Sequence, residues 1–199
     1  MRTNRFGFLL SLFAALALIL AASLPASAAP VTTPASGPVR DQGTGIVLPM
    51  VLGEMQFISV TDFQSPGLGV SYRYRNVAYP YNVDLYIYNK NQAIPEGTDA
   101  AIVRQEVEQA LNDMRAVAAQ GVYKNLNIGK PEKCTYGWVS FICVSATLEA
   151  NNRALFSVLL LRGDRNNFIK IRATWPAADP QSPSLFDGWA QGLSKLLQP

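Results

Sequence analysis

An alternating pattern that decides the fold occupies residues 68–75, which read LGVSYRYR. Apolar and aromatic side chains take every second position, and glycine, serine and arginine take the positions between them. A period of two predicts a β-strand with one face toward the core and one toward solvent. The pattern returns in VDLYIY at residues 83–88, so we expect these strands to form an antiparallel hairpin around Tyr79, Pro80 and Tyr81.

A long amphipathic helix is expected next, because apolar residues recur at helical spacing between residues 99 and 120 and Gly121 ends the pattern. Its charged face excludes full burial, so the helix is expected to lie across a sheet. Four strand candidates follow, at residues 123–128, 139–149, 154–162 and 168–175, and a shorter amphipathic helix occupies residues 185–197. These elements predict the α+β class, an antiparallel sheet with one long and one C-terminal helix packed against it.

The order of these elements resembles that of the Mog1/PsbP-like α/β sandwich. The resemblance lies in FQSPGLGVSY at residues 63–72, in DLYIY at residues 84–88, and in Ile94 and Pro95, which lead into the helix that ends in QGVY at residues 120–123. Within this fold group the chain is similar to small exported bacterial proteins of uncharacterised function, over residues 55–175 at best. The resemblance implies a binding or accessory module and assigns no site residues.

The first 28 residues have the three parts of a cleavable secretory signal. Arg2 and Arg5 precede an apolar run, and the small side chains of Ala26 and Ala28 fit the cleavage site. Cleavage is therefore expected after Ala28, although the apolar run also approaches the length of an uncleaved membrane anchor. The predicted organisation is a signal peptide at 1–28, a flexible linker at 29–45 that is rich in Pro, Thr, Ser and Gly, and a single globular domain at 46–199.

The charge of the mature chain argues against nucleic acid as a partner. Loss of Arg2 and Arg5 with the signal leaves 15 of the 17 basic side chains, against 14 acidic ones. A protein so close to neutrality has no long-range field to gather nucleic acid or an anionic membrane surface. We expect the protein in the periplasm or outside the cell, with no transmembrane segment after cleavage.

The two cysteines of the chain, Cys134 and Cys143, are expected to form a disulfide, because isolated pairs in an oxidising compartment usually do so. A redox pair is the alternative. Their spacing of nine positions differs from the Cys-x-x-Cys arrangement that lowers the pKa of one thiol, so we favour a structural bridge.

The chain contains no histidine, which narrows the chemistry that it can perform. This absence excludes catalytic nucleophiles that are activated by histidine, and it excludes zinc sites with histidine ligands. No phosphate-binding glycine motif or carboxylate pair stands out, so no catalytic residue, cofactor or metal is assigned. The expected function is that of a non-catalytic envelope protein that binds a protein, a peptide or a small apolar ligand. A hydrolase that uses carboxylates and a structural or stress-related assembly factor remain as alternatives.

Candidate binding residues come from the aromatic and arginine content of the chain. We assign a ligand or partner surface to Arg73, Arg75, Tyr79, Tyr81 and Trp138, because aromatic rings offer stiff contact area and arginine can grip a carboxylate. Tyr79 and Tyr81, beside the loop proline, are expected to be exposed. In the alternative interpretation, the strand tyrosines cover the sheet and pack beneath the helix, and Trp138 covers the edge of the core.

Overall fold

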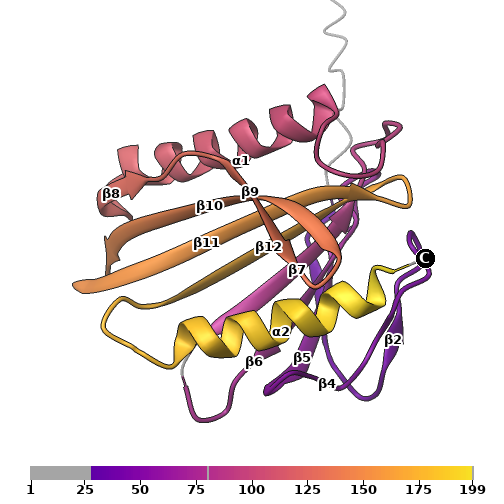
Figure 1. The fold of residues 1–199 in the computed structure, drawn as a ribbon, viewed down its shortest axis with the longest axis horizontal. Coiled ribbons are helices and arrows are strands. Elements are labelled where there is room, and N and C mark those ends of the chain that lie inside the picture. Colours follow the sequence, from indigo (N-terminus) through magenta and orange to yellow (C-terminus); the bar gives the residue numbers. More distant parts are fainter. Residues whose placement is uncertain (1–27, 80, 199) are drawn as a thin grey trace, which may run out of the picture.

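Two helices lie on opposite sides of one antiparallel sheet (Figure 1). The computed structural model describes residues 28–79 and 81–198. The long helix is α1 (Ala101–Ala119), and the C-terminal helix is α2 (Ser182–Leu196). The fold class expected from the sequence is therefore confirmed.

The sheet contains ten strands in the described part of the chain. Its main path runs through β1 (Val31–Pro34), β5 (Met55–Asp62), β6 (Val70–Arg75), β7 (Asn82–Tyr88), β12 (Asn167–Pro176), β11 (Arg153–Asp164), β10 (Val139–Ala150) and β8 (Lys124–Ile128). Off this path, β4 (Val51–Leu52) pairs with β5 and β9 (Glu132–Tyr136) pairs with β10, while β2 (Val39–Arg40) and β3 (Val47–Leu48) form a separate ribbon. The hairpin expected around residues 79–81 joins β6 to β7.

Side chains alternate between the two faces of the sheet, and each face forms a core with one of the helices. On β12, Ile169 and Ile171 belong to the core beneath α2, and Phe168 belongs to the core beneath α1. Lys170 and Arg172 share the side of Phe168, since successive side chains of a strand point to opposite faces. One face of this strand is thus apolar from Ile169 to Trp175, and the other carries two cations.

The layer beneath α2 is an aromatic core. Trp189 of α2 is fully buried, and its ring contacts Tyr74 of β6 at 5.7 Å and Phe186 at 6.3 Å between centroids. Trp175 of β12 lies 5.8 Å from Phe186 and so joins the same cluster. The tyrosine face of the alternating stretch therefore packs beneath the C-terminal helix.

The stretch predicted to be a flexible linker, residues 29–45, forms ordered structure, so that prediction is wrong. Strand β1 pairs with β5 along its whole length. The buried carboxylate of Asp41 accepts hydrogen bonds from the backbone and hydroxyl of Thr44, and one from the Tyr72 hydroxyl at 2.7 Å. These contacts use backbone groups and one buried acid, which leave no apolar periodicity in the sequence.

The signal predicted at residues 1–28 lies, except for its last residue, outside the described residues. Within the described part of the chain, no helix has both the length and the apolar character needed to cross a membrane.

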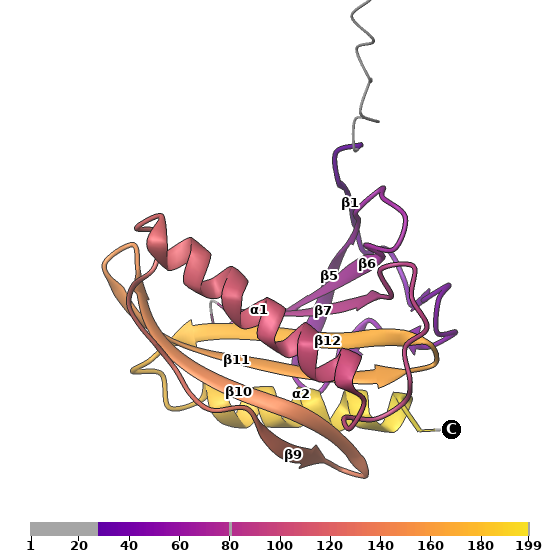
Figure 2. The same cartoon turned by 90° about the horizontal axis from the view of Figure 1, so that it is seen from above.

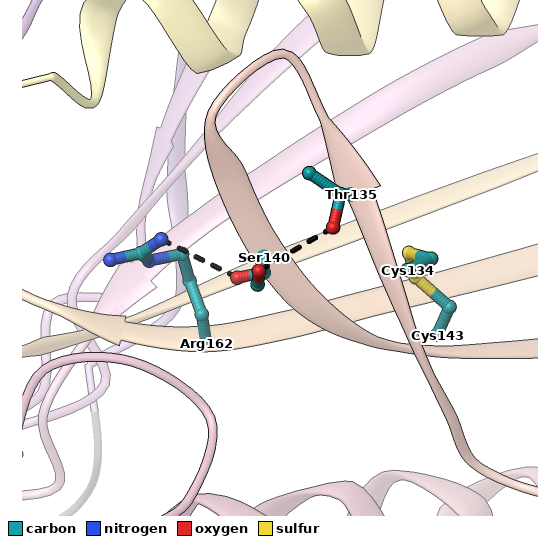
Figure 3. Close-up of a disulfide and its surroundings, with 5 residues drawn as sticks. All are labelled: Cys134, Thr135, Ser140, Cys143 and Arg162. Carbon is teal, nitrogen blue, oxygen red and sulfur yellow. Dashed lines mark hydrogen bonds between the residues drawn. A yellow bond between two sulfur atoms is a disulfide. The ribbon is translucent and has the colours of Figure 1, made fainter.

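The expected disulfide between Cys134 and Cys143 is confirmed, with 5.9 Å between the two Cα atoms. It joins β9 to β10 within one hairpin, and both cysteines pack against the core on the α2 side. Figure 3 shows Ser140 beside the bridge, where its carbonyl accepts a hydrogen bond from Arg162 of β11 at 3.4 Å. The bridge therefore ties the edge strand β9 to the body of the sheet.

Removing this bridge, with Cys134→Ser and Cys143→Ser together, is expected to lower the free energy of unfolding by about 2–3 kcal/mol. The physical reason is that the closed loop restricts the unfolded chain. Urea unfolding of the oxidised protein and the variant measures the difference. Reduction of the wild type should reproduce the loss, whereas the variant should not respond to reductant. Equal midpoints for all samples would contradict a stabilising role.

Candidate functional site

Helix α1 covers only part of its side of the sheet. It packs on β11 and β8, and Figure 2 shows it lying diagonally, with β5 and β6 beyond its edge. The side chains left beside the helix come from β6, β7 and β12, whose alternation turns polar residues to this face. A partly covered polar sheet face of this kind forms the wall of a cleft.

Three cavities, with volumes of about 260, 130 and 300 Å³, lie on this face of the sheet. Residues of α1 line the second and third, and Tyr123, which follows α1 in the chain, lines the first. All three are lined by Tyr86, the first two share Arg172, and the last two share Lys170 and Asp113. The three cavities therefore adjoin one another around these shared side chains. We call the group the Tyr86 cleft, defined by Asp84, Tyr86, Tyr88, Asp113, Lys170 and Arg172.

Lys170 is a cation of this cleft that lies against two aromatic rings and has no counter-ion among the described residues. Its Nζ lies 4.9 Å from the ring centroids of both Tyr86 and Tyr88. Burial lowers the pKa of Lys170, and the carboxylates of Glu106 and Asp113 act in the opposite direction. Within the described residues no carboxylate forms an ion pair with it. Two aromatic faces stabilise this cation in place of a counter-ion.

Glu106 of α1 has a buried side chain and lines a cavity with Lys170, but both of its oxygens already have partners. The Tyr88 hydroxyl donates to its Oε1 at 2.7 Å, and Lys90 pairs with its other oxygen. Burial also raises the pKa of Tyr88, so this phenol stays protonated and remains a donor. Both oxygens of Glu106 are thus used away from Lys170.

Arg172 is the second cation of the cleft. It donates to the Tyr123 hydroxyl at 3.0 Å, and its guanidinium lies 5.9 Å from the centre of the same ring. Asp84 sits opposite Arg172 in the register of β7 and β12. However, Asp84 accepts two hydrogen bonds from Arg73, at 2.7 and 3.1 Å. Arg172, like Lys170, has no ion pair within the described part of the chain.

The predicted site residues do not form one surface. Arg73 lies at the margin of the cleft through its contact with Asp84, and Arg75 is exposed two positions further along β6. Tyr79 is half-buried and packs against the core on the α2 side. Trp138 is 88% exposed at the turn of the β9–β10 hairpin. Of these four, the structure brings only the two arginines to the cleft side of the sheet.

The prediction that Tyr81 is exposed is wrong. It is only 2% exposed, and its ring lies 5.8 Å from that of Trp175. The residue directly precedes β7 and continues the alternation of Val83 and Leu85, so it turns toward the core. The periodicity of the strand, and not the neighbouring loop, decided the direction of this side chain.

Lys170 and Arg172 were missed as site residues, although the sequence carries a signal for them. They alternate with Ile169 and Ile171 in FIKIRATW at residues 168–175, just as the arginines alternate with tyrosines in β6. Two cations on one face of a strand in the middle of a sheet are expected to face a cleft or a partner, because covering a charge without solvent or a counter-ion is costly.

A larger cavity, of about 570 Å³, lies between the first half of α1 and β9. Its walls include Asp99 and Lys133, which form an ion pair at 2.7 Å while 78% and 63% exposed. Exposed pairs of this kind are well solvated and contribute little. We therefore place the candidate site at the Tyr86 cleft, where Lys170 and Arg172 are half-buried and form no ion pair within the described residues.

The described residues contain no group of three acids or cysteines that could hold a metal ion. Two acids, Glu106 and Asp113, do line the same cavity. They are seven residues apart on α1, which places their backbones about 10 Å apart along the helix axis. Asp113 also accepts a hydrogen bond from Gln109 at 2.8 Å, so neither acid is free of protein donors.

No family model matches the sequence, and no curated protein matches it. Among solved structures, the chain is similar to the solution structure of cyanobacterial PsbP (CyanoP) from Synechocystis sp. PCC 6803. The match covers 82% of this chain and 91% of that chain, with 16% identity and a TM-score of 0.46. That protein lies in the fold group whose resemblance the sequence suggested, and the likeness concerns the fold alone.

Proposed function

We propose that this protein is a non-catalytic, exported binding module that holds a small ligand in the Tyr86 cleft. The observation that carries the proposal is the placement of Lys170 and Arg172. Both line the central cavity of this cleft, and neither forms an ion pair with a described carboxylate. Half-buried cations without counter-ions are costly to keep, so their presence in a cleft favours a binding role.

The composition of the cleft supports binding over catalysis. The chain has no histidine to act as a general base near pH 7. The buried acid Glu106 is held by two donors, and Asp84 is held by Arg73. Cavities of a few hundred Å³ also suit a metabolite-sized molecule better than a folded partner. A charged cleft favours a polar ligand over the small apolar ligand expected from the sequence.

Export is supported by two independent features. The first 28 residues have the pattern of a secretory signal, and the confirmed bridge between Cys134 and Cys143 is of the kind that persists in oxidising compartments. We therefore place the binding module in the periplasm or outside the cell.

Native mass spectrometry of protein purified from its own cell envelope tests this proposal. We expect a polypeptide that begins at Ala29 and lacks two hydrogens, with additional mass that disappears on denaturation. The same measurement on a double variant, Lys170→Met with Arg172→Met, should show the polypeptide without the additional mass. A bare wild-type protein that also shows no thermal shift with any member of a metabolite panel would overturn the binding function.

A further inference from the structure

We propose that the ligand of the Tyr86 cleft carries an oxyanion, a carboxylate or phosphate group, which Lys170 and Arg172 hold together. This inference rests on the proposed function and names the chemistry that the site selects.

The two cations are placed to act on one group. They are two positions apart on β12 and share a face, which puts their backbones about 7 Å apart. Both line the central cavity of about 130 Å³. Long side chains at this spacing can both reach an anion of two or three oxygens in that cavity, and arginine offers a planar set of donors that matches either carboxylate or phosphate.

The acids around the cleft are largely neutralised by other partners. Asp84 is bound by Arg73 through two hydrogen bonds, and Glu106 is bound by Lys90 and Tyr88. Asp113 remains, but its side chain is at the exposed surface of α1, where solvent screens its charge. The central cavity therefore keeps an excess of positive charge that an incoming anion would neutralise.

The adjoining cavity of about 300 Å³ offers room for the rest of the ligand. Phe63, Leu68 and the ring of Tyr86 form part of its wall. The rings of Phe63 and Tyr86 are nearly parallel, with centroids 6.4 Å apart, and they add apolar area to the wall beside Lys170. A small molecule with an oxyanion at one end and an apolar or aromatic body fits both parts of the cleft.

Binding should be linked to the protonation of Lys170. Burial lowers the pKa of this amine, and a bound anion would favour its charged form. The charged and titratable groups that face it are Tyr86 and Tyr88 and Lys90 after β7, Glu106 and Asp113 from α1, and Arg172 from its own strand. The affinity is therefore expected to fall as the pH rises toward 10.5, the ordinary pKa of lysine.

Isothermal titration calorimetry with benzoate and phenyl phosphate, at low salt, tests the inference on the mature protein. Lys170→Met and Arg172→Met should each weaken binding at least about tenfold, because each removes a charge-assisted contact. Lys195→Met, an exposed lysine in the last turn of α2, is the matched control and should leave the affinity unchanged. Far-UV circular dichroism verifies that each variant is folded.

The two probes also separate the sources of the oxyanion. Binding of benzoate alone identifies a carboxylate ligand, and binding of phenyl phosphate alone identifies a phosphate ligand. The inference is overturned if neither anion binds at millimolar concentration, or if both bind the Lys170→Met variant as tightly as the wild type. If benzyl alcohol binds the cleft while the anions do not, the oxyanion is wrong and the binding function stands.

Discussion

Replacing Trp189 with alanine is expected to lower the free energy of unfolding by about 3–5 kcal/mol, the range for deleting a large aromatic side chain from a core. Trp189 is 0% exposed and contacts the rings of Tyr74 and Phe186. Its loss would leave a cavity between α2 and the sheet that the surrounding rings cannot fill. Urea unfolding followed by circular dichroism measures the change.

Trp138 provides the matched control, because the same substitution is made at a position that is 88% exposed. Trp138→Ala should change stability by less than about 0.5 kcal/mol, as most surface substitutions do. Equal losses at the two positions would show that Trp138 packs in solution against something else. A loss below about 1 kcal/mol for Trp189→Ala would mean that α2 contributes little to the core.

Replacing Gly163 with alanine is expected to cost about 3 kcal/mol. A Cβ at this position would lie 1.9 Å from the carbonyl oxygen of Pro95, a backbone atom that cannot move alone. Gly163 also exchanges two backbone hydrogen bonds with Gly97, at 2.9 and 2.8 Å. Alanine would force the segment before α1 away from β11, at a cost typical of overpacked sites.

Gly188, in the interior of α2, gives the opposite sign for the same substitution. No atom lies within 4 Å of a Cβ built there, and alanine is favoured over glycine in a helix by about 0.5–1 kcal/mol. Gly188→Ala should therefore raise the unfolding midpoint while Gly163→Ala lowers it.

Because Gly163 anchors the segment that leads into α1, Gly163→Ala should also weaken ligand binding in the Tyr86 cleft. Intact stability and binding in Gly163→Ala would show that this segment is free to shift.

The sequence predicted the elements whose signal is local. Alternation identified β6 and β7, and helical periodicity placed α1 to within two residues of its observed ends. It missed β9, which is short and pairs only with β10, and it missed β1, which is held by backbone hydrogen bonds to β5. Pairing of an edge strand depends on its neighbour, so its own residues reveal little of it.

The site was harder to predict than the fold, because it is assembled across strands. Arg73 was identified, but its partner Asp84 and the cations of β12 come together only when β6, β7 and β12 lie side by side. Tyr81 shows the reverse error, since a loop position suggested exposure while the alternation of the next strand buried it. Cross-strand neighbours decide the first case, and alternation along β7 decides the second.

The two faces of β12 have separate roles, one in the core and one in the cleft, and this separation could be used in engineering. Ile169 and Ile171 secure the core beneath α2, while Lys170 and Arg172 turn to the cleft. The residues that we propose to set the ligand preference therefore alternate in sequence with residues of the core, and the two sets lie on opposite faces of the sheet. Substitution at positions 170 and 172 could reverse or remove the charge of the pocket. The ligand preference could then be changed without altering the residues of the core.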